Sequence, residues 1–389
     1  MKVFERLQQS TPREWESVRL GNLCEVFRGS SPRPKGDPRF FGGPIPWISI
    51  ADVTAEPSPY LHHTKEGVTP EGAKRSRLVE AGQLILSNSA TICVPKLLAI
   101  DGCIHDGFLS FRDFKYPTDL KYLYHFFGFV GPHVRREFKQ GVTQSNLNTG
   151  IAKAFAIPLP PLPEQKRIAA ILDAADALRA KRRESIEQLD SLVQATFLEM
   201  FGDPVTNPKG WVVEPLGRIA SNEDGKRVPV KKADREKTQG HYPYYGASGV
   251  IDHVDDYLFD GERLLIGEDG ANLLARSTPI AFRAHGKYWV NNHAHVLADN
   301  GEASLVFLET LINRLDLTQY VSGSAQPKLT QKSLNAIPIP TPPLNLQTRF
   351  ASIVESIEVQ KAQLQAHLAE LDALFSSLQS RAFNGELVA

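Results

Sequence analysis

The stretch Pro160-Pro161-Leu162-Pro163-Glu164-Gln165-Lys166-Arg167 returns as Pro342-Pro343-Leu344-Asn345-Leu346-Gln347-Thr348-Arg349, at an offset of 342 − 160 = 182 residues. The paired prolines end any preceding helix or strand, because proline lacks the backbone N–H that both structures use. The segment after the first pair, from Glu164 to Met200, contains no Gly or Pro. The sequence therefore predicts that a long helix begins after each proline pair.

Both segments carry apolar residues at heptad spacing, which is typical of helices that pack along a seam. At 1.5 Å per residue, the first segment would form a rod of roughly 55 Å. Because a whole domain separates the two segments in the sequence, we expect them to pack antiparallel. Arg182 and Lys361 interrupt the seam, where they either fix its register or extend their charged ends into water. The predicted helix-pair seam consists of Ile168, Leu172, Leu178, Ile186, Leu189, Val193, Phe350, Val354, Ile357, Leu364, Leu368, Leu371, Phe375 and Leu378.

The chain on either side of the proline pairs is also duplicated. Trp15–Leu23 matches Trp211–Ile219 with an offset of 211 − 15 = 196, and Gly141–Leu147 matches Gly323–Leu329 with an offset of 323 − 141 = 182. The intervals between these matches contain short apolar runs broken by Gly, Pro, Asn and Asp, which favours β-structure with some helix. Inside those intervals the two copies share little sequence.

The duplication predicts an α+β fold. Two β-rich domains are joined by two long antiparallel helices, a coiled coil, in a pseudo-twofold arrangement. The predicted parts are a first domain at 1–157, a helical region at 158–203, a second domain at 204–337 and a second helical region at 338–389.

Composition places the chain among globular proteins, with 42% hydrophobic and 23% charged residues. Residues 1–10 lack the uninterrupted apolar run of a secretory signal, and no segment reads as a membrane span, so we expect a cytoplasmic protein. Cys24, Cys93 and Cys103 show no C-x-x-C spacing, which argues against disulfides and a zinc site and favours buried thiols. The 44 basic and 44 acidic residues cancel. A nucleic-acid binder of this composition needs local basic patches or a partner that supplies positive charge.

Motifs for catalysis are missing from the sequence. Asp37-Pro38-Arg39-Phe40 approaches the motif that holds a flipped adenine, but it lacks the second proline and has no cofactor loop before it. No Gly-x-x-x-x-Gly-Lys-Ser/Thr phosphate loop is present. His293 and His295 would share one face of a strand, but the sequence offers them no third metal ligand. We therefore predict no catalytic residue, no metal site and no cofactor bound by this chain.

Over essentially its full length the chain resembles the specificity subunits of type I restriction-modification systems. The resemblance rests on the two Pro-Pro-Leu-x-x-Gln-x-Arg helix entries, the two Gly-x-x-Gln-x-x-Leu loops, and the segments Tyr242–Gly249 and Asn291–Val296. It implies two target recognition domains that each read one half of a split double-stranded DNA sequence. It also implies helical spacers that dock two modification (methyltransferase) subunits. Those partners would hold S-adenosylmethionine and methylate adenine, and restriction (motor-nuclease) subunits can join the complex.

Candidate DNA contacts follow from local composition. Clustered Lys and Arg suit phosphate contacts, and exposed Arg, Asn and Gln suit bidentate pairing with base edges. Each cluster also fits a solvated loop that contacts nothing. We expect the loop shared by the two copies to position backbone or to pack the domain on its helix, and base specificity to lie in the unshared parts. The candidates are Arg28, Arg33, Lys35, Arg39, Asn88, Arg135, Arg136, Gln144, Asn146, Lys226, Arg227, Lys231, Lys232, Tyr244, Tyr245, Asn272, Asn291, Asn292, Gln326 and Lys328.

Two other functions fit parts of the sequence. A scaffold protein would use the coiled coil to present two protein-binding modules. A self-sufficient methyltransferase would need the motifs that are missing. The sequence therefore favours a non-catalytic, DNA-reading subunit.

Overall fold

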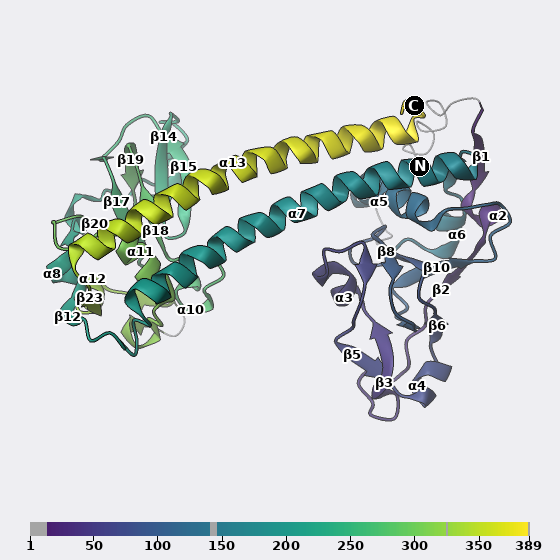
Figure 1. The fold of residues 1–389 in the computed structure, drawn as a ribbon, viewed down its shortest axis with the longest axis horizontal. Coiled ribbons are helices and arrows are strands. Elements are labelled where there is room, and N and C mark those ends of the chain that lie inside the picture. The colour runs from purple at the N-terminus through teal and green to yellow at the C-terminus, as the bar shows by residue number, and fades with distance from the viewer. Residues whose placement is uncertain (1–13, 141–145, 324–325, 388–389) are drawn as a thin grey trace. The chain divides into compact units, whose positions relative to one another are not determined.

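The computed structural model describes residues 14–140, 146–323 and 326–387. The chain divides into two compact units, one made of residues 1–182 with 367–389 and the other of residues 183–366. Two long helices, α7 (Leu162–Phe201) and α13 (Leu344–Phe383), each contribute one part to unit 1 and the other part to unit 2 (Figure 1). Within the described ranges, none of the helices combines the length and apolar character needed to cross a bilayer.

Unit 1 is built from short strands and short helices, with α5 as its longest helix apart from the two shared ones. Its strands are β1 (Glu16–Arg19), β2 (Glu25–Arg28), β3 (Phe41–Ile48), β4 (Tyr60–Leu61), β5 (Glu66–Val68), β6 (Arg77–Val79), β7 (Leu84–Ser87), β8 (Pro95–Leu98), β9 (Gly102–Ile104), β10 (Phe108–Arg112) and β11 (Ala156–Leu159). Its helices are α2 (Leu20–Leu23), α3 (Ile50–Ala55), α4 (Pro70–Lys74), α5 (Leu120–Gln140) and α6 (Thr149–Lys153).

Unit 2 has the same character. Its strands are β12 (Val212–Pro215), β13 (Ser221–Asn222), β14 (Tyr242–Gly246), β15 (Gly249–Val254), β16 (Phe259–Asp260), β17 (Arg263–Gly267), β18 (Ala281–Ala284), β19 (Lys287–Val290), β20 (Ala294–Ala298), β21 (Val321–Ser322), β22 (Lys328–Leu329) and β23 (Pro338–Thr341). Its helices are α8 (Leu216–Ile219), α9 (Lys232–Arg235), α10 (Asn272–Ala275), α11 (Leu305–Arg314) and α12 (Gln331–Asn335), with 3₁₀ turns η1 (Asp224–Lys226) and η2 (Thr318–Tyr320).

The two units share one sheet topology although their interiors share little sequence. The first sheet is ordered β2-β10-β7-β8-β4 in unit 1 and β13-β20-β17-β18 in unit 2. The second is ordered β5-β3-β9-β6 and β15-β14-β19-β16, with a parallel pair at its centre in both units. A further two-stranded ladder joins the start of each domain to its end, as β1 with β11 and as β12 with β23. The α+β class with two β-rich domains and two long helices is therefore confirmed.

The repeated glycines Gly21 and Gly217 are explained by close packing. A Cβ atom on Gly21 would lie 2.9 Å from the Cβ of Lys153 in α6, and one on Gly217 would lie 2.9 Å from the Cβ of Asn335 in α12. A larger residue would push the short helix away from its neighbour. The duplication thus preserves the contacts that close each domain.

The repeated glutamines Gln165 and Gln347 fasten the first turn of each long helix to its domain. Both side chains are fully buried. The Gln165 amide donates to the carbonyl oxygens of Pro160 and Pro117 and accepts from the N–H of Asp119, which directly precedes α5. In unit 2 the Gln347 amide donates to Pro342 and accepts from the N–H of Ser304, which directly precedes α11. The motif therefore joins a helix start, a proline pair and a domain helix through satisfied buried hydrogen bonds.

In each unit the end of one long helix completes the aromatic core. Phe383, at the end of α13, lies in unit 1 with its ring centroid 5.2 Å from that of Phe129 and 5.4 Å from that of Phe126, both on α5. In unit 2, Phe201 at the end of α7 lies 4.9 Å from Phe307 of α11 and 5.4 Å from Phe350 of α13. Each domain core is thus completed by the start of one long helix and the end of the other.

The helices run antiparallel within each unit, as predicted. Arg179 of α7 donates to Asp372 of α13 over 2.6 Å in unit 1, and Lys361 of α13 pairs with Asp190 of α7 in unit 2. Both pairs obey one register, since 179 + 372 and 190 + 361 both equal 551. Lys361 therefore bridges the two helices rather than extending into water.

The predicted seam residues are buried or half-buried with one exception. Leu178 is 56% exposed, so its assignment to the seam was wrong. The neighbouring Arg179 takes the inner place instead, with its guanidinium 4.3 Å above the ring of Phe375. An arginine that stacks on an aromatic ring can fill a seam position because its stem and planar head are weakly hydrated.

Replacing Phe383 with Ala should destabilise unit 1, although the residue lies near the C-terminus. Removing a buried Phe side chain costs about 3–5 kcal/mol, because the cavity is only partly refilled. We expect hydrogen exchange to accelerate in α5, where the ring packs. Leu374→Ala, at an exposed position of the same helix, is the matched control and should leave α5 protected; equal loss of protection in both variants would contradict the assignment.

Candidate functional site

A basic surface covers one part of unit 1 around the loop between β2 and β3. Arg28, Arg33, Lys35 and Arg39 all have exposed side chains there. The loop is held down by Asp106, which lies between β9 and β10: the Ser31 hydroxyl donates to its carboxylate over 2.6 Å, and Arg28 Nε donates to its backbone oxygen over 2.6 Å. These contacts fix the loop backbone, and the guanidinium groups of Arg33 and Arg39 remain largely exposed while approaching the carboxylates of Asp106 and Asp37 to 3.8 and 2.6 Å.

Two further features hold the loop between β2 and β3 against the β9–β10 connection. Gly29 packs against the β9–β10 connection so closely that a Cβ atom would lie 2.2 Å from the His105 carbonyl oxygen. Burial works against ionisation of Asp106, but the Ser31 hydrogen bond and the nearby cationic groups, including Arg28, outweigh it and lower the pKa of that carboxyl. The loop is therefore anchored to an ionised carboxylate.

The sequence-based search missed three basic residues of the same surface. Lys74, Arg75 and Arg77 are exposed beside the loop, which is joined to their segment by hydrogen bonds from Ser30 to the Arg75 carbonyl and from Ser76 to the Ser30 carbonyl. The run Lys74-Arg75-Ser76-Arg77 is visible in the sequence as a local excess of charge. We call the whole set surface 1: Arg28, Arg33, Lys35, Arg39, Lys74, Arg75 and Arg77.

Unit 2 carries a second basic surface in the segment after β13. Lys226, Lys231, Lys232 and Lys237 are exposed there, and we call them surface 2. The backbone of this segment is held by Arg235. Arg235 donates to the Asp252 carboxylate over 2.8 Å and to the Val230 carbonyl over 2.6 Å.

Four of the candidates chosen from the sequence are not exposed. Tyr244 is buried, and its hydroxyl accepts the N–H of Val230 over 2.9 Å. Asn88 and Asn291 are also buried, and Asn291 accepts the N–H of His293. Arg227 is nearly buried and donates to the Glu268 carboxylate over 2.7 Å. These side chains build the domain and do not face solvent, because polar residues of short strands and turns are drawn inward where the backbone supplies partners.

Three other candidates are occupied by structural contacts. Asn272 closes the turn after α10 by bonding the Thr278 backbone and the Ser277 hydroxyl. Tyr245 is half-buried against Phe282 and Tyr288. Arg135 donates to the carbonyl oxygens of Ile92 and Cys93 and so holds the loop after β7.

The remaining described candidates keep exposed side chains, while Gln144 lies outside the described residues. The three cysteines are buried and free, as expected. The exposed candidates are Arg28, Arg33, Lys35, Arg39, Arg136, Asn146, Lys226, Lys231, Lys232, Asn292, Gln326 and Lys328.

The loop shared by the two copies packs its domain in the same way in each unit. Leu147 and Leu329 are fully buried, and each donates its backbone N–H over 2.8 Å to the residue after a central strand, Asn88 in unit 1 and Glu268 in unit 2. These contacts join the loop to the end of a central strand in each unit, and packing of the domain on its helix through this loop stays a prediction. Its polar side chains Asn146 and Gln326 face outward.

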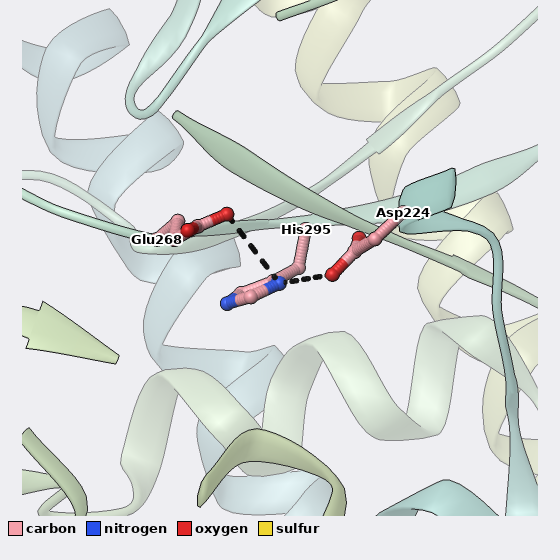
Figure 2. A group of neighbouring side chains, drawn as sticks. All are labelled: Asp224, Glu268 and His295. Carbon is pink, nitrogen blue, oxygen red and sulfur yellow. Dashed lines mark hydrogen bonds and ion pairs between the residues drawn. The ribbon is translucent and has the colours of Figure 1, made fainter. Parts of the chain in front are cut away.

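Beneath the unit 2 loop lies a buried cluster of Asp224, Glu268 and His295 (Figure 2). His295 of β20 is fully buried; its Nδ1 lies 2.6 Å from the Asp224 carboxylate and its Nε2 lies 2.7 Å from the Leu329 carbonyl oxygen. Arg227 and Lys328 approach the Glu268 carboxylate to 2.7 and 3.1 Å. His293 precedes β20 and contacts Asp269, so the two histidines do not share a strand face as the sequence suggested.

This cluster has the spacing of metal ligands but the chemistry of an ion-pair network. Both ring nitrogens of His295 already lie at hydrogen-bond distance from oxygen atoms, those of Asp224 and Leu329, so neither is directed at an open coordination position. Arg227 also lies 3.4 Å from Asp224, so guanidinium and ammonium groups already neutralise both carboxylates. The donor set therefore does not fit a cation site.

Burial alone would raise the pKa of Asp224 and Glu268, yet both are held below their ordinary values. The hydrogen bond and charge of His295 lower the pKa of Asp224, and the hydrogen bonds from Arg227 and Lys328 lower the pKa of Glu268. Both carboxylates are therefore ionised inside the domain.

Sequence comparison with known proteins relates this chain to one family. The family described as "Type I restriction modification DNA specificity domain" matches residues 12–188 and 208–371. The type I restriction enzyme EcoprrI specificity subunit of Escherichia coli is 24% identical over 92% of this chain and 90% of its own length. A putative type I restriction enzyme specificity subunit of Haemophilus influenzae is 36% identical over 37% of this chain and 36% of its own length.

Solved structures share the fold. The crystal structure of a type I restriction-modification S subunit from M. genitalium matches 95% of this chain and 96% of its own, with a TM-score of 0.60 and 15% identity. A chain from a study of complex assembly and conformational transition of the type I R-M system matches 97% of this chain and 99% of its own, with a TM-score of 0.58 and 18% identity.

Acidification should loosen the buried network of unit 2. The pKa values of Asp224 and Glu268 are lowered in the folded state, so their contribution to stability is fully present above about pH 4 and is lost as the pH falls through the folded values. The protection factor of the β20 amides, which corrects for the slower intrinsic exchange in acid, should decrease between pH 6 and pH 3. Glu268→Gln should be less protected at pH 6 and change less on acidification, whereas Glu302→Gln, an exposed control, should follow the parent chain.

Proposed function

Because this chain belongs to the family of type I restriction-modification DNA specificity subunits, whose role is DNA sequence recognition, we propose that it reads a bipartite double-stranded DNA target. Each β-rich domain reads one half of the target. The long helices dock two modification subunits, which carry S-adenosylmethionine and methylate adenine. Restriction subunits can join the complex. This chain contributes recognition, and the chemistry belongs to its partners.

The proposal rests on one observation: the two units share a fold but expose different loops. The two units have the same sheet topology, the same buried glutamine and the same leucine loop. Each presents its own basic surface of unrelated sequence, surface 1 in unit 1 and surface 2 in unit 2. Two domains of one construction with different exposed loops suit one task, groove contact, on two different sequences.

Exposed apolar side chains on the long helices support docking of the partner subunits. Leu178, Val359 and Leu374 are at least half exposed. In unit 2 a cavity of about 410 Å³ is lined by Leu192 and Thr196 of α7 and by Arg349, Ser352, Ile353, Ser356 and Ile357 of α13. Apolar positions outside the seam have no role in holding the two helices together, and a partner would cover them.

Neutralising the basic surfaces should weaken DNA binding and reduce its salt dependence. Each phosphate contact removed lowers the slope of log K against log salt by about 0.9. We expect Arg33→Gln with Lys35→Gln, and separately Lys231→Gln with Lys232→Gln, to lower affinity in a mobility-shift assay with modification subunits present. Lys166→Gln with Lys181→Gln, on the first long helix, is the control. Absence of any sequence-preferring binding by the parent complex would favour a protein-binding scaffold instead.

Lengthening both long helices should widen the gap between the half-sites. One heptad inserted after Arg182 and one after Ala366 keep the apolar seam in phase and preserve the antiparallel register. Seven residues add about 10 Å of helix, which corresponds to at most about three base pairs. Selection of binding sites from random duplexes should return unchanged half-sites with a longer gap; altered half-sites with an unchanged gap would show that the helices do not set the spacing.

A further inference from the structure

The buried network of unit 2 has no counterpart at the matching positions of unit 1. The strand pairings align Leu109 with His295, since each faces the next-to-last residue of the neighbouring central strand, Leu86 of β7 and Ile266 of β17. By the same pairing, Asn88 of unit 1 corresponds to Glu268 of unit 2. By the offset of 196 residues, Arg28 corresponds to Asp224. Unit 1 therefore has an arginine, an amide and an apolar residue where unit 2 has two carboxylates and an imidazole.

Stability alone does not account for this difference. Removing charges from water costs several kcal/mol per ion, and apolar residues of similar volume often do as well or better. Leu109 is fully buried in unit 1 and closes the same sheet without any charge. Unit 1 therefore closes the corresponding sheet without these ions, which points to a role for them beyond closing the sheet.

Two members of the network, His295 and Glu268, contact the segment Gln326–Leu329. His295 Nε2 donates to the Leu329 carbonyl oxygen, and Leu329 donates its N–H to the Glu268 carbonyl oxygen. The Pro327 carbonyl oxygen accepts the N–H of Gly270. The Lys328 ammonium lies 3.1 Å from Glu268 and remains half-exposed. An ammonium group has three N–H donors, so contact with Glu268 leaves donors free to bind a phosphate.

We infer that His295, Asp224 and Glu268 are positioning residues that hold Gln326 and Lys328 for contact with DNA, so that recognition by the second domain, but not by the first, depends on this buried network. The inference rests on the proposed function. His295 holds the loop backbone through the Leu329 carbonyl oxygen, Asp224 contacts the other ring nitrogen of His295, and Glu268 pairs with Lys328 at the surface. Gln326 is exposed at the outer side of the loop, where its amide can pair with a base edge or backbone.

The test uses the full chain in complex with its modification subunits and a pool of random-sequence DNA duplexes. The double variant Asp224→Asn with His295→Leu removes the carboxylate and the imidazole. It places leucine at 295, the residue type that unit 1 has at the matching position, Leu109. Binding sites are selected with the parent, with this variant and with Glu302→Gln as control. We expect base preference at the half-site read by the second domain to fall by about tenfold or more, which is the effect of losing one good base contact, while the other half-site keeps its preference.

A second variant covers the case in which the first one unfolds. Glu268→Gln keeps the side-chain volume, and unchanged hydrogen exchange in α11 and β18, which lie outside the network, checks the fold. It should weaken the same half-site alone, and Lys328→Gln should lower the salt slope by about 0.9. Unchanged preference at both half-sites, or equal loss at both in a folded variant, would overturn the inference. A parent complex that selects no sequence would overturn the proposed function itself.

Discussion

The structure depends on one reciprocal arrangement: each long helix begins in the core of one unit and ends in the core of the other. Gln165 and Gln347 fix the beginnings through fully buried amides. Phe383 and Phe201 fix the ends by packing on α5 and α11. Neither domain can complete its core from its own continuous stretch of chain. The positions that make these contacts are therefore constrained, and the remaining exposed loops are free to differ between the two copies.

Repetition made much of this fold predictable. A proline pair followed by an uninterrupted heptad pattern specifies a helix start from local chemistry, and the same pattern at 160 and 342 specifies two. The sequence could not show why Gln165 or Gly21 recurs, because their partners, Asp119 and Lys153, are distant in the chain. Leu178 shows the limit of heptad reasoning: an arginine that stacks on Phe375 displaces an apolar residue from the seam.

The candidate site was less predictable than the fold. Local charge identified surface 2 and most of surface 1, because basic residues in loops are seldom buried. Composition could not show that Tyr244 and Arg227 point inward, since their backbone partners, Val230 and Ala294, lie 14 and 67 residues away in the chain. The network of Asp224, Glu268 and His295 joins three separate elements and leaves no local pattern. It distinguishes two domains that otherwise share one topology.

A common frame with distinct exposed loops is a suitable construction for reading two different half-sites with one chain. Sequencing of methylated adenine in the genome of a host that carries this chain and its modification subunits tests that claim most directly. We predict a new methylated motif made of two specific half-sites separated by a gap of fixed length without base preference. A single contiguous motif, or no new motif, would contradict it.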